Sequence, residues 1–167
     1  MSRNVPDADA GQMEELIIRD ARPSDAATIV EFNMKMAMET EGRSLDPELI
    51  NPGVAAVLAD PGRGRYWVAE MDGQVVGQLM ITCEWSDWRN GVFWWIQSVF
   101  IREDCRRKGI FSALHRHVEA LARSAGEVCG IRLYVELENR RAQKTYEALG
   151  MTSPGYQVME IDFRKGQ

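Results

Sequence analysis

The 167-residue chain lacks long apolar segments. No run approaches the roughly 20 apolar residues that a membrane helix needs, and residues 2–12 lack the apolar core of a secretory signal. Cysteine is scarce, and the 3 cysteines are far apart without any Cys-x-x-Cys spacing, which argues against a disulfide framework or a zinc site. We therefore expect a cytoplasmic protein with reduced thiols, no membrane partner and no metal.

The chain also has few positive charges, because it contains 20 Lys and Arg residues against 25 Asp and Glu residues, for a net charge of −5. Binding to nucleic acid needs a broad basic surface, so nucleic acid is not an expected partner. The 45% hydrophobic and 27% charged residues are ordinary for a globular protein. We expect a flexible polar tail at residues 1–15 and one domain at residues 16–167.

The first half of the chain predicts strands and helices in the order β-αα-ββ. A short strand at residues 16–21 precedes a helix that starts after Ser24 and Asp25 and runs to about Thr40. A second helical piece begins at Asp46-Pro47, with an interruption at Pro52-Gly53. Strands at residues 66–70 and 75–81 flank Asp72-Gly73, a dipeptide that tight hairpin turns favour.

The second half alternates strands and helices. We expect a loop at residues 85–91, strands at residues 94–101 and 131–137, helices at residues 110–125 and 139–149, and a closing strand or hairpin at residues 155–163. A strand, helix and strand in succession require a right-handed crossover and parallel pairing, while the hairpin requires antiparallel pairing. The fold class is thus α/β, with a mixed sheet and helices on both faces. His115 and His117, expected at the surface, point in different directions on their helix and cannot chelate one metal.

A basic loop joins the strand at 94–101 to the helix at 110–125. It carries Arg106, Arg107, Lys108 and Gly109. The first N–H groups of a helix have no intrahelical acceptor, and the helix dipole makes that end electropositive, so such a junction can cradle phosphate. The alternative is a solvated turn with soluble side chains.

Two motifs resemble those of the GNAT acetyltransferase superfamily. The loop Arg106-x-x-Gly109-x-Phe111 is similar to the acyl-CoA pyrophosphate loop of that family, although the family has a small residue in place of Phe111. Further on, Leu133-x-Val135 followed by Asn139, Ala142, Tyr146 and Gly150-Met151 matches its second signature. The resemblance covers about residues 16–163.

The resemblance implies a sheet that splays open where acetyl-CoA inserts between the fourth and fifth strands. It implies that the backbone N–H of Val99 polarises the thioester carbonyl, that Ile101 pairs with the pantetheine arm, and that Tyr146 protonates the departing thiolate. From periodicity alone, Tyr146 is a half-buried core aromatic and Asn139 a helix N-cap. The acyl-CoA contacts so implied are Val99, Ile101, Arg106, Arg107, Lys108, Gly109, Ile110, Phe111, Ser112, Asn139, Ala142 and Tyr146.

The general base is not evident, because Trp95 stands where relatives often carry Glu. Candidates are Glu84, Asp87, Glu136 and, through a water, Gln97; a water chain alone is the alternative. Trp85 and Trp88 lie close to Glu84 and Asp87 in the sequence, and such a group could bind an amine by cation–π attraction and charge. The candidate acceptor residues are Glu84, Trp85, Asp87, Trp88 and Gln97.

The resemblance thus implies an acetyl-CoA-dependent N-acetyltransferase that acetylates a primary amine by direct attack in a ternary complex. The acceptor is a small amine or a peptide amine, and a homodimer is conceivable because relatives often pair through strand edges. The alternative is an acyl-CoA-binding or regulatory module that has lost the chemistry, which the missing Glu would permit.

Overall fold

The computed structural model describes residues 15–163, so all but Glu15 of the predicted tail lies outside it. The described chain divides after Tyr134 into two compact units, each of which is described by itself. The first unit holds β1 (Ile17–Asp20), α1 (Ala26–Glu41), α2 (Pro47–Ala59), β2 (Arg65–Met71), β3 (Gln74–Ser86), β4 (Gly91–Ile101), α3 (Ile110–Ser124) and β5 (Val128–Leu133). The second holds α4 (Arg140–Ala148).

The five strands form one mixed sheet in the order β1-β2-β3-β4-β5. Strands β1 to β4 pair antiparallel, and β4 pairs parallel with β5 across the α3 crossover. Asp72 and Gly73 make the β2–β3 turn with φ of 50° and 74°, the left-handed conformation that a two-residue hairpin requires. The predicted α/β class, the hairpin and the local parallel pairing are confirmed.

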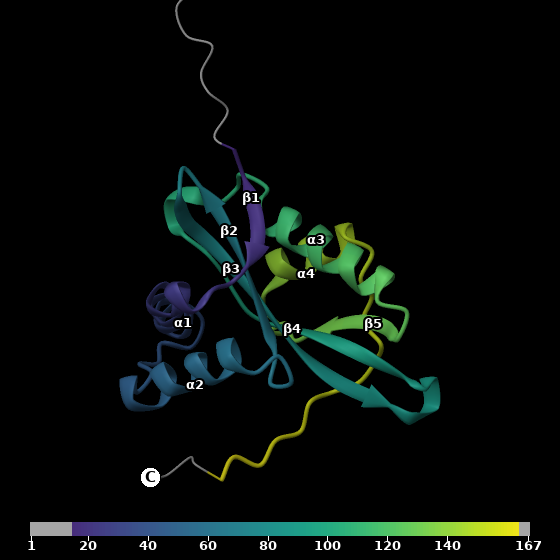
Figure 1. Ribbon diagram of the computed structural model, residues 1–167. Helices are drawn as coiled ribbons and strands as arrows, with labels where there is room; N and C mark the ends of the chain where they lie inside the picture. The colour runs from purple at the N-terminus through teal and green to yellow at the C-terminus, as the bar shows by residue number, and fades with distance from the viewer. Residues whose placement is uncertain (1–14, 164–167) are drawn as a thin grey trace, which may run out of the picture. The chain divides into compact units, whose positions relative to one another are not determined.

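Helices cover both faces of the sheet (Figure 1). Alternate residues of a strand point to opposite faces, and β2 shows this clearly. Trp67 packs in a cluster with Leu114 of α3, whereas Val68 packs with Ile29 of α1 and Val54 of α2. The sheet thus separates two apolar layers, one under α3 and one under α1 and α2.

Helix α2 is continuous, so the predicted interruption at Pro52-Gly53 is wrong. The helix begins where Asp46 accepts a hydrogen bond from the Glu48 N–H at 2.8 Å, with Pro47 in the first turn. A proline inside a helix removes one backbone bond, yet tertiary packing can outweigh that loss. Here Val54 is buried against the α1 layer.

Several other boundaries differ from the sequence prediction. Strand β3 continues through Ser86, so the expected loop shrinks to a turn at Asp87–Arg89. Strand β5 spans Val128–Leu133 rather than 131–137. The expected closing strand at residues 155–163 is absent from this described segment, where apolar side chains such as Met159 are exposed.

The expected surface position of His115 is also wrong. His115 is only 3% exposed, because it lies on the buried face of α3.

Candidate functional site

A β-bulge interrupts β4 at Ser98 and Val99. The chain takes three steps along β4, from Gln97 to Phe100, against two steps along β3, from Met80 to Gln78. Ser98 has φ of 48°, a left-handed conformation that is uncommon for a residue with a side chain. A bulge leaves an extra residue outside the regular ladder and re-aims the neighbouring side chains.

The bulge changes which side chains of β4 face which layer. Before it, Trp94 and Ile96 pack in the α3 layer; after it, Val99 and Ile101 do so. An uninterrupted strand would send these two pairs to opposite faces. The extra residue thus leaves Ser98 on the α1 side, while Val99 faces α3.

A chain of buried hydrogen bonds supports the bulge from β3. The fully buried side chain of Gln78 donates through Nε2 to the Ser98 carbonyl at 3.1 Å and to Asn33 Oδ1 at 2.7 Å. Asn33 in turn donates through Nδ2 to the Tyr66 hydroxyl at 3.1 Å. Buried polar groups of this kind are stable only when they are paired. The three side chains therefore connect α1, β2 and β3 to the bulge.

Strands β4 and β5 part at the same level. Their parallel register begins at Val92 and ends where Ile96 pairs with Leu133. Beyond that point, within the described chain, Val99 has no partner in the β4–β5 or β3–β4 register. The splayed sheet that the resemblance implies is therefore present, and its opening coincides with the bulge.

The loop after β4 leads into the N-terminus of α3. Arg107 and Gly109 have φ of 67° and 77°, and left-handed residues of this type turn successive N–H groups toward one side, as in anion-binding nests. The Ala113 N–H donates to the Gly109 carbonyl at 3.0 Å, which starts the helical pattern. The N–H groups of the first turn have no intrahelical acceptor and suit an anion.

The three cations of this loop have different surroundings. Arg106 is held by α1, because its guanidinium donates to both carboxylate oxygens of Glu39, at 2.7 and 2.9 Å, and also to the Ile101 carbonyl at 2.9 Å. Arg107 and Lys108 are exposed, and no described carboxylate pairs with Arg107. The side chain of Arg106 therefore ties the loop to α1, whereas Arg107 and Lys108 lie at the surface beside the helix start.

The remaining predicted contacts at the α3 start divide between core and surface. Ile110 is buried and Phe111 packs against the same apolar cluster. This packing explains how a large residue is accommodated where the family has a small one. Ser112 is partly buried in the first turn. Gly77 of β3 makes room for the side chain of Ile101, because a Cβ on Gly77 would lie 2.7 Å from Ile101 Cδ1.

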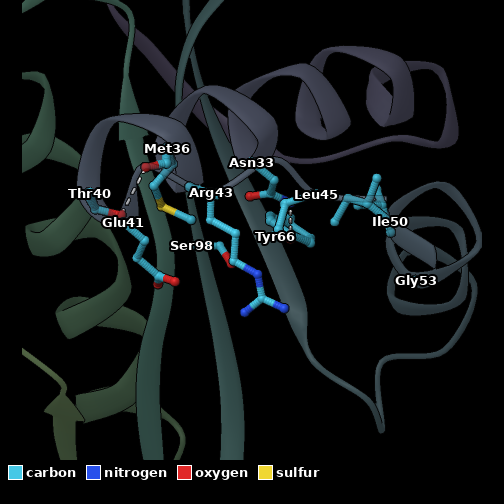
Figure 2. Close-up of a pocket in the computed structure, with 12 residues that line it drawn as sticks. Asn33, Met36, Thr40, Glu41, Arg43, Leu45, Ile50, Gly53, Tyr66 and Ser98 are labelled. Carbon is cyan, nitrogen blue, oxygen red and sulfur yellow. Dashed lines mark hydrogen bonds between the residues drawn. The ribbon is translucent and has the colours of Figure 1, made fainter. Parts of the chain in front are cut away.

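A cavity of about 310 Å³ lies on the other side of the bulge, between α1, α2 and the sheet (Figure 2). Ser98, Asn33 and Tyr66 contribute polar groups to its lining. Its charged groups are those of Glu41, at the end of α1, and of Arg43, which follows α1. Its remaining walls are mainly apolar and are formed by Met36, Ala37, Leu45, Ile50 and Val54. The volume lies at the lower end of the range of about 300 to 1,000 Å³ that is usual for small-molecule sites.

The acceptor residues predicted from the sequence lie elsewhere. Trp85 and Trp88, near the β3–β4 turn, are 61% and 88% exposed. The carboxylate of Glu84 accepts hydrogen bonds from Trp95 Nε1 and from the Arg132 guanidinium. Glu84 is therefore already engaged, and neither it nor the two tryptophans line the cavity.

The other acceptor and base candidates are also hydrogen-bonded. Asp87 accepts from the backbone N–H of Trp88 at 2.9 Å. Gln97 donates through Nε2 to the Thr82 hydroxyl at 2.6 Å. In the second unit, Glu136 accepts from the Glu138 N–H at 3.0 Å. Their roles in proton transfer stay predictions.

Helix α4 and its N-cap carry Asn139, Ala142 and Tyr146 of the second motif. Asn139 is its N-cap and accepts a hydrogen bond from the Ala142 N–H at 3.0 Å, as the periodicity predicts. Tyr146 is half-buried, and burial raises the pKa of its hydroxyl. A phenol with a raised pKa stays protonated at neutral pH, as a general acid must be.

Sequence reasoning missed the cavity residues. They come from α1, the segment after it, α2, β2 and β4, and no motif joins them. A polar residue such as Gln78 within the otherwise apolar run 75–81 was the one available signal, because a buried amide needs partners.

Residues 15–163 hold neither a metal-binding cluster nor a membrane-spanning helix. No group of three or more His, Cys, Asp or Glu side chains in this range is arranged to hold a metal ion. None of the helices described is both long enough and apolar enough to cross a bilayer.

Comparison with known proteins agrees with this architecture. The crystal structure of a possible acetyltransferase from Clostridium difficile 630 is 45% identical, with a TM-score of 0.83 over 88% of this chain and 97% of that chain. A ribosomal-protein-alanine N-acetyltransferase from Brucella melitensis biovar Abortus 2308 shares the fold at 17% identity, with a TM-score of 0.71 over 89% of this chain and 99% of that one. Glucosamine-6-phosphate N-acetyltransferase from Arabidopsis thaliana does so at 19% identity, with a TM-score of 0.69 over 89% and 99%.

The sequence profile of the acetyltransferase (GNAT) family matches residues 28–151, well over half of the chain. Among curated proteins, none matches the sequence. Since both the family profile and a 45% identical structure cover most of its length, the chain belongs to the GNAT acetyltransferase family.

Proposed function

We propose that the protein is an acetyl-CoA-dependent N-acetyltransferase that acetylates a primary amine by direct attack within a ternary complex. The observation that carries the proposal is the bulge in β4. Ser98 lines the cavity on the α1 side, whereas Val99 faces the α3 layer at the level where β4 and β5 part. An acyl donor along the open edge and an acceptor in the cavity would meet at these two residues.

The residues present suit acetyl-CoA, which supplies the acetyl group as a thioester. The first turn of α3 and the exposed Arg107 and Lys108 suit the negative pyrophosphate. The edge of β4 at Ile101 suits the amides of the pantetheine arm. Asn139 and Ala142 on α4 complete the proposed contacts.

Three groups share the chemistry. The Val99 N–H donates to the carbonyl oxygen as negative charge develops there, at no cost in reorganisation during the reaction. The nitrogen of the neutral amine forms the new C–N bond while the C–S bond breaks, and the Tyr146 hydroxyl gives its proton to the sulfur. Water takes the proton that the amine loses; the predicted bases Glu84 and Asp87 do not line the cavity, whereas the Glu41 carboxylate lies at its rim.

Direct attack agrees with the positions of the cysteines. Cys83 and Cys129 are exposed, Cys105 is buried, and none of the three lines the cavity. A covalent route through a thiolate would need a reactive cysteine beside the acyl group. We therefore assign no enzyme nucleophile.

Release of free thiol from acetyl-CoA, measured with and without a panel of small and peptide amines, tests the proposed activity. The expected result is release that depends on the amine and is accompanied by the acetylated product. Tight binding of acetyl-CoA without turnover of any amine would support the non-catalytic module and contradict the proposal.

Gly109→Val is expected to weaken CoA binding by roughly 10-fold or more, the equivalent of one lost hydrogen bond to a charged group. A Cβ at this position meets nothing within 4 Å, so the added side chain clashes with no neighbour in the folded protein. However, a branched side chain disfavours the φ of 77° that opens the cradle, and it stands where the anion approaches. Calorimetric titration with CoA measures the change.

Gly126→Val is the matched control. Gly126 follows the other end of α3, has φ of 59°, and a Cβ added there would also meet nothing within 4 Å. It therefore carries a similar backbone strain without facing the cradle, and its CoA affinity should stay that of the wild type. Equal affinities for both folded variants would refute the assignment of the phosphate site.

A further inference from the structure

The charged rim of the cavity suggests what kind of amine it accepts, and this inference rests on the proposed N-acetyltransferase activity. Arg43 and Glu41 both line the cavity. Figure 2 shows the side chain of Arg43 reaching from the end of α1 across the cavity, with Ser98 and Tyr66 on either side of it. A cation in this place faces whatever occupies the cavity.

Arg43 has no carboxylate partner among the described residues. Other described arginines also lack such a partner, but Arg43 is the arginine among the residues that line the cavity, and Glu41 is only two residues away. The arginines that do pair with a carboxylate are Arg19, Arg63, Arg65, Arg102, Arg106, Arg123 and Arg132. An unpaired arginine at the mouth of a cavity is suited to a ligand carboxylate, which can accept two parallel N–H bonds from it.

The backbone of Arg43 is fixed. Gly42 ends α1 with φ of 62°, and its N–H donates to the Met38 carbonyl at 3.1 Å. The Arg43 N–H donates to the Ala37 carbonyl at 3.3 Å. These bonds hold the residue against the last turn of the helix, so the guanidinium starts from a defined point beside the cavity.

The other walls define the rest of the ligand. Ser98, next to the proposed site of acetyl transfer, marks where the amine must lie. Apolar side chains, among them Met36, Leu45 and Ile50, line the space around it. The cavity of about 310 Å³ has room for a small molecule. Glu41 disfavours a ligand with excess negative charge and tolerates one that also carries an ammonium group.

We propose that the acceptor is a small amine that carries a carboxylate, such as an amino acid with an apolar side chain, and that Arg43 binds this carboxylate. The amine would then lie toward Ser98 and Val99, the apolar body against α1 and α2, and the carboxylate at the mouth. Arg43 selects the acceptor and takes no part in the acetyl transfer itself.

The test compares Arg43→Gln with the wild type on leucine, on leucinamide, which lacks the carboxylate, and on 3-methylbutylamine, which lacks the carboxamide as well. We expect kcat/KM for leucine to fall by about 10- to 100-fold, mostly through KM, since a hydrogen-bonded charge pair is lost. The kcat/KM values for the two acceptors that lack a carboxylate should change by less than about twofold. Comparing variants on each acceptor cancels the difference in amine pKa between acceptors.

Two further variants make the result specific. Arg43→Lys keeps the charge but cannot form a bidentate pair with a carboxylate, so its kcat/KM for leucine should lie between those of Arg43→Gln and the wild type. Arg63→Gln removes an exposed arginine that pairs with Asp60 and does not line the cavity, and it should behave as the wild type. Equal losses on all acceptors, or no loss on leucine, would overturn the role of Arg43 while leaving the acetyltransferase proposal intact. Acetylation of none of these or other amines would overturn that proposal and this inference together.

Discussion

Tyr146→Phe is expected to lower kcat by about 100-fold or more with little change in CoA affinity, because general acids usually contribute a factor of about 10² to 10⁴. The substitution keeps the ring of this half-buried residue and removes only the hydroxyl. Burial raises the pKa of that hydroxyl above its usual value, so it stays protonated below about pH 10. The loss should therefore be constant from about pH 6 to 9, and steady-state kinetics where chemistry limits turnover measures it.

Tyr156→Phe is the matched control in the same unit. Tyr156 is 81% exposed, so loss of its hydroxyl should change neither rate nor stability. If the folded Tyr146→Phe protein has the kcat of the wild type, Tyr146 is a packing residue and the general acid must be sought elsewhere.

Gln78→Leu is expected to damage both stability and turnover. The fully buried amide donates to Asn33 and to the Ser98 carbonyl, and leucine has a similar volume but no donor. The buried Asn33 oxygen and the partly buried Ser98 carbonyl would lose a partner, while the unpaired buried Oε1 of Gln78 would be removed, for a net cost of about 1 to 3 kcal/mol in the free energy of unfolding. In addition, the bulge would lose its tie to β3, and we expect kcat to fall roughly 10-fold as the Val99 N–H loses its fixed position.

Leu114→Ala separates the two effects of Gln78→Leu. Leu114 is fully buried in the α3 layer, and its truncation should cost about 2 to 5 kcal/mol. Urea unfolding gives the stabilities, and kcat is then compared at a temperature where both variants are folded. Equal kcat values in the two variants would show that Gln78 acts only on stability.

Local sequence signals predicted the elements that depend on local chemistry. Asp72-Gly73 specified the hairpin, and the apolar stripe of Leu114 and Val118 specified α3. The failures involve tertiary context. Helix α2 continues through Pro52 because Val54 is held by the core, and the expected strand at 155–163 would need a partner strand that its own sequence cannot reveal.

The candidate site was predicted only where a motif marks it. The loop around Gly109 and the helix of Tyr146 were marked by their resemblance to two family motifs, whereas periodicity alone makes Tyr146 a core aromatic. The bulge at Ser98 could not be predicted, because no glycine or proline marks it in the sequence. The cavity could not be predicted because residues far apart in the sequence, such as Arg43 and Ser98, meet only in the folded chain.

The central claim is direct transfer of acetyl from acetyl-CoA to an amine held in the same complex. Initial rates of formation of the labelled amide from carbon-13 acetyl-CoA, measured while both substrates are varied, test it most directly. We predict double-reciprocal lines that intersect, as a ternary complex requires. Parallel lines would indicate a covalent acetyl-enzyme, and absence of labelled amide with every amine, despite CoA binding, would contradict the claim altogether.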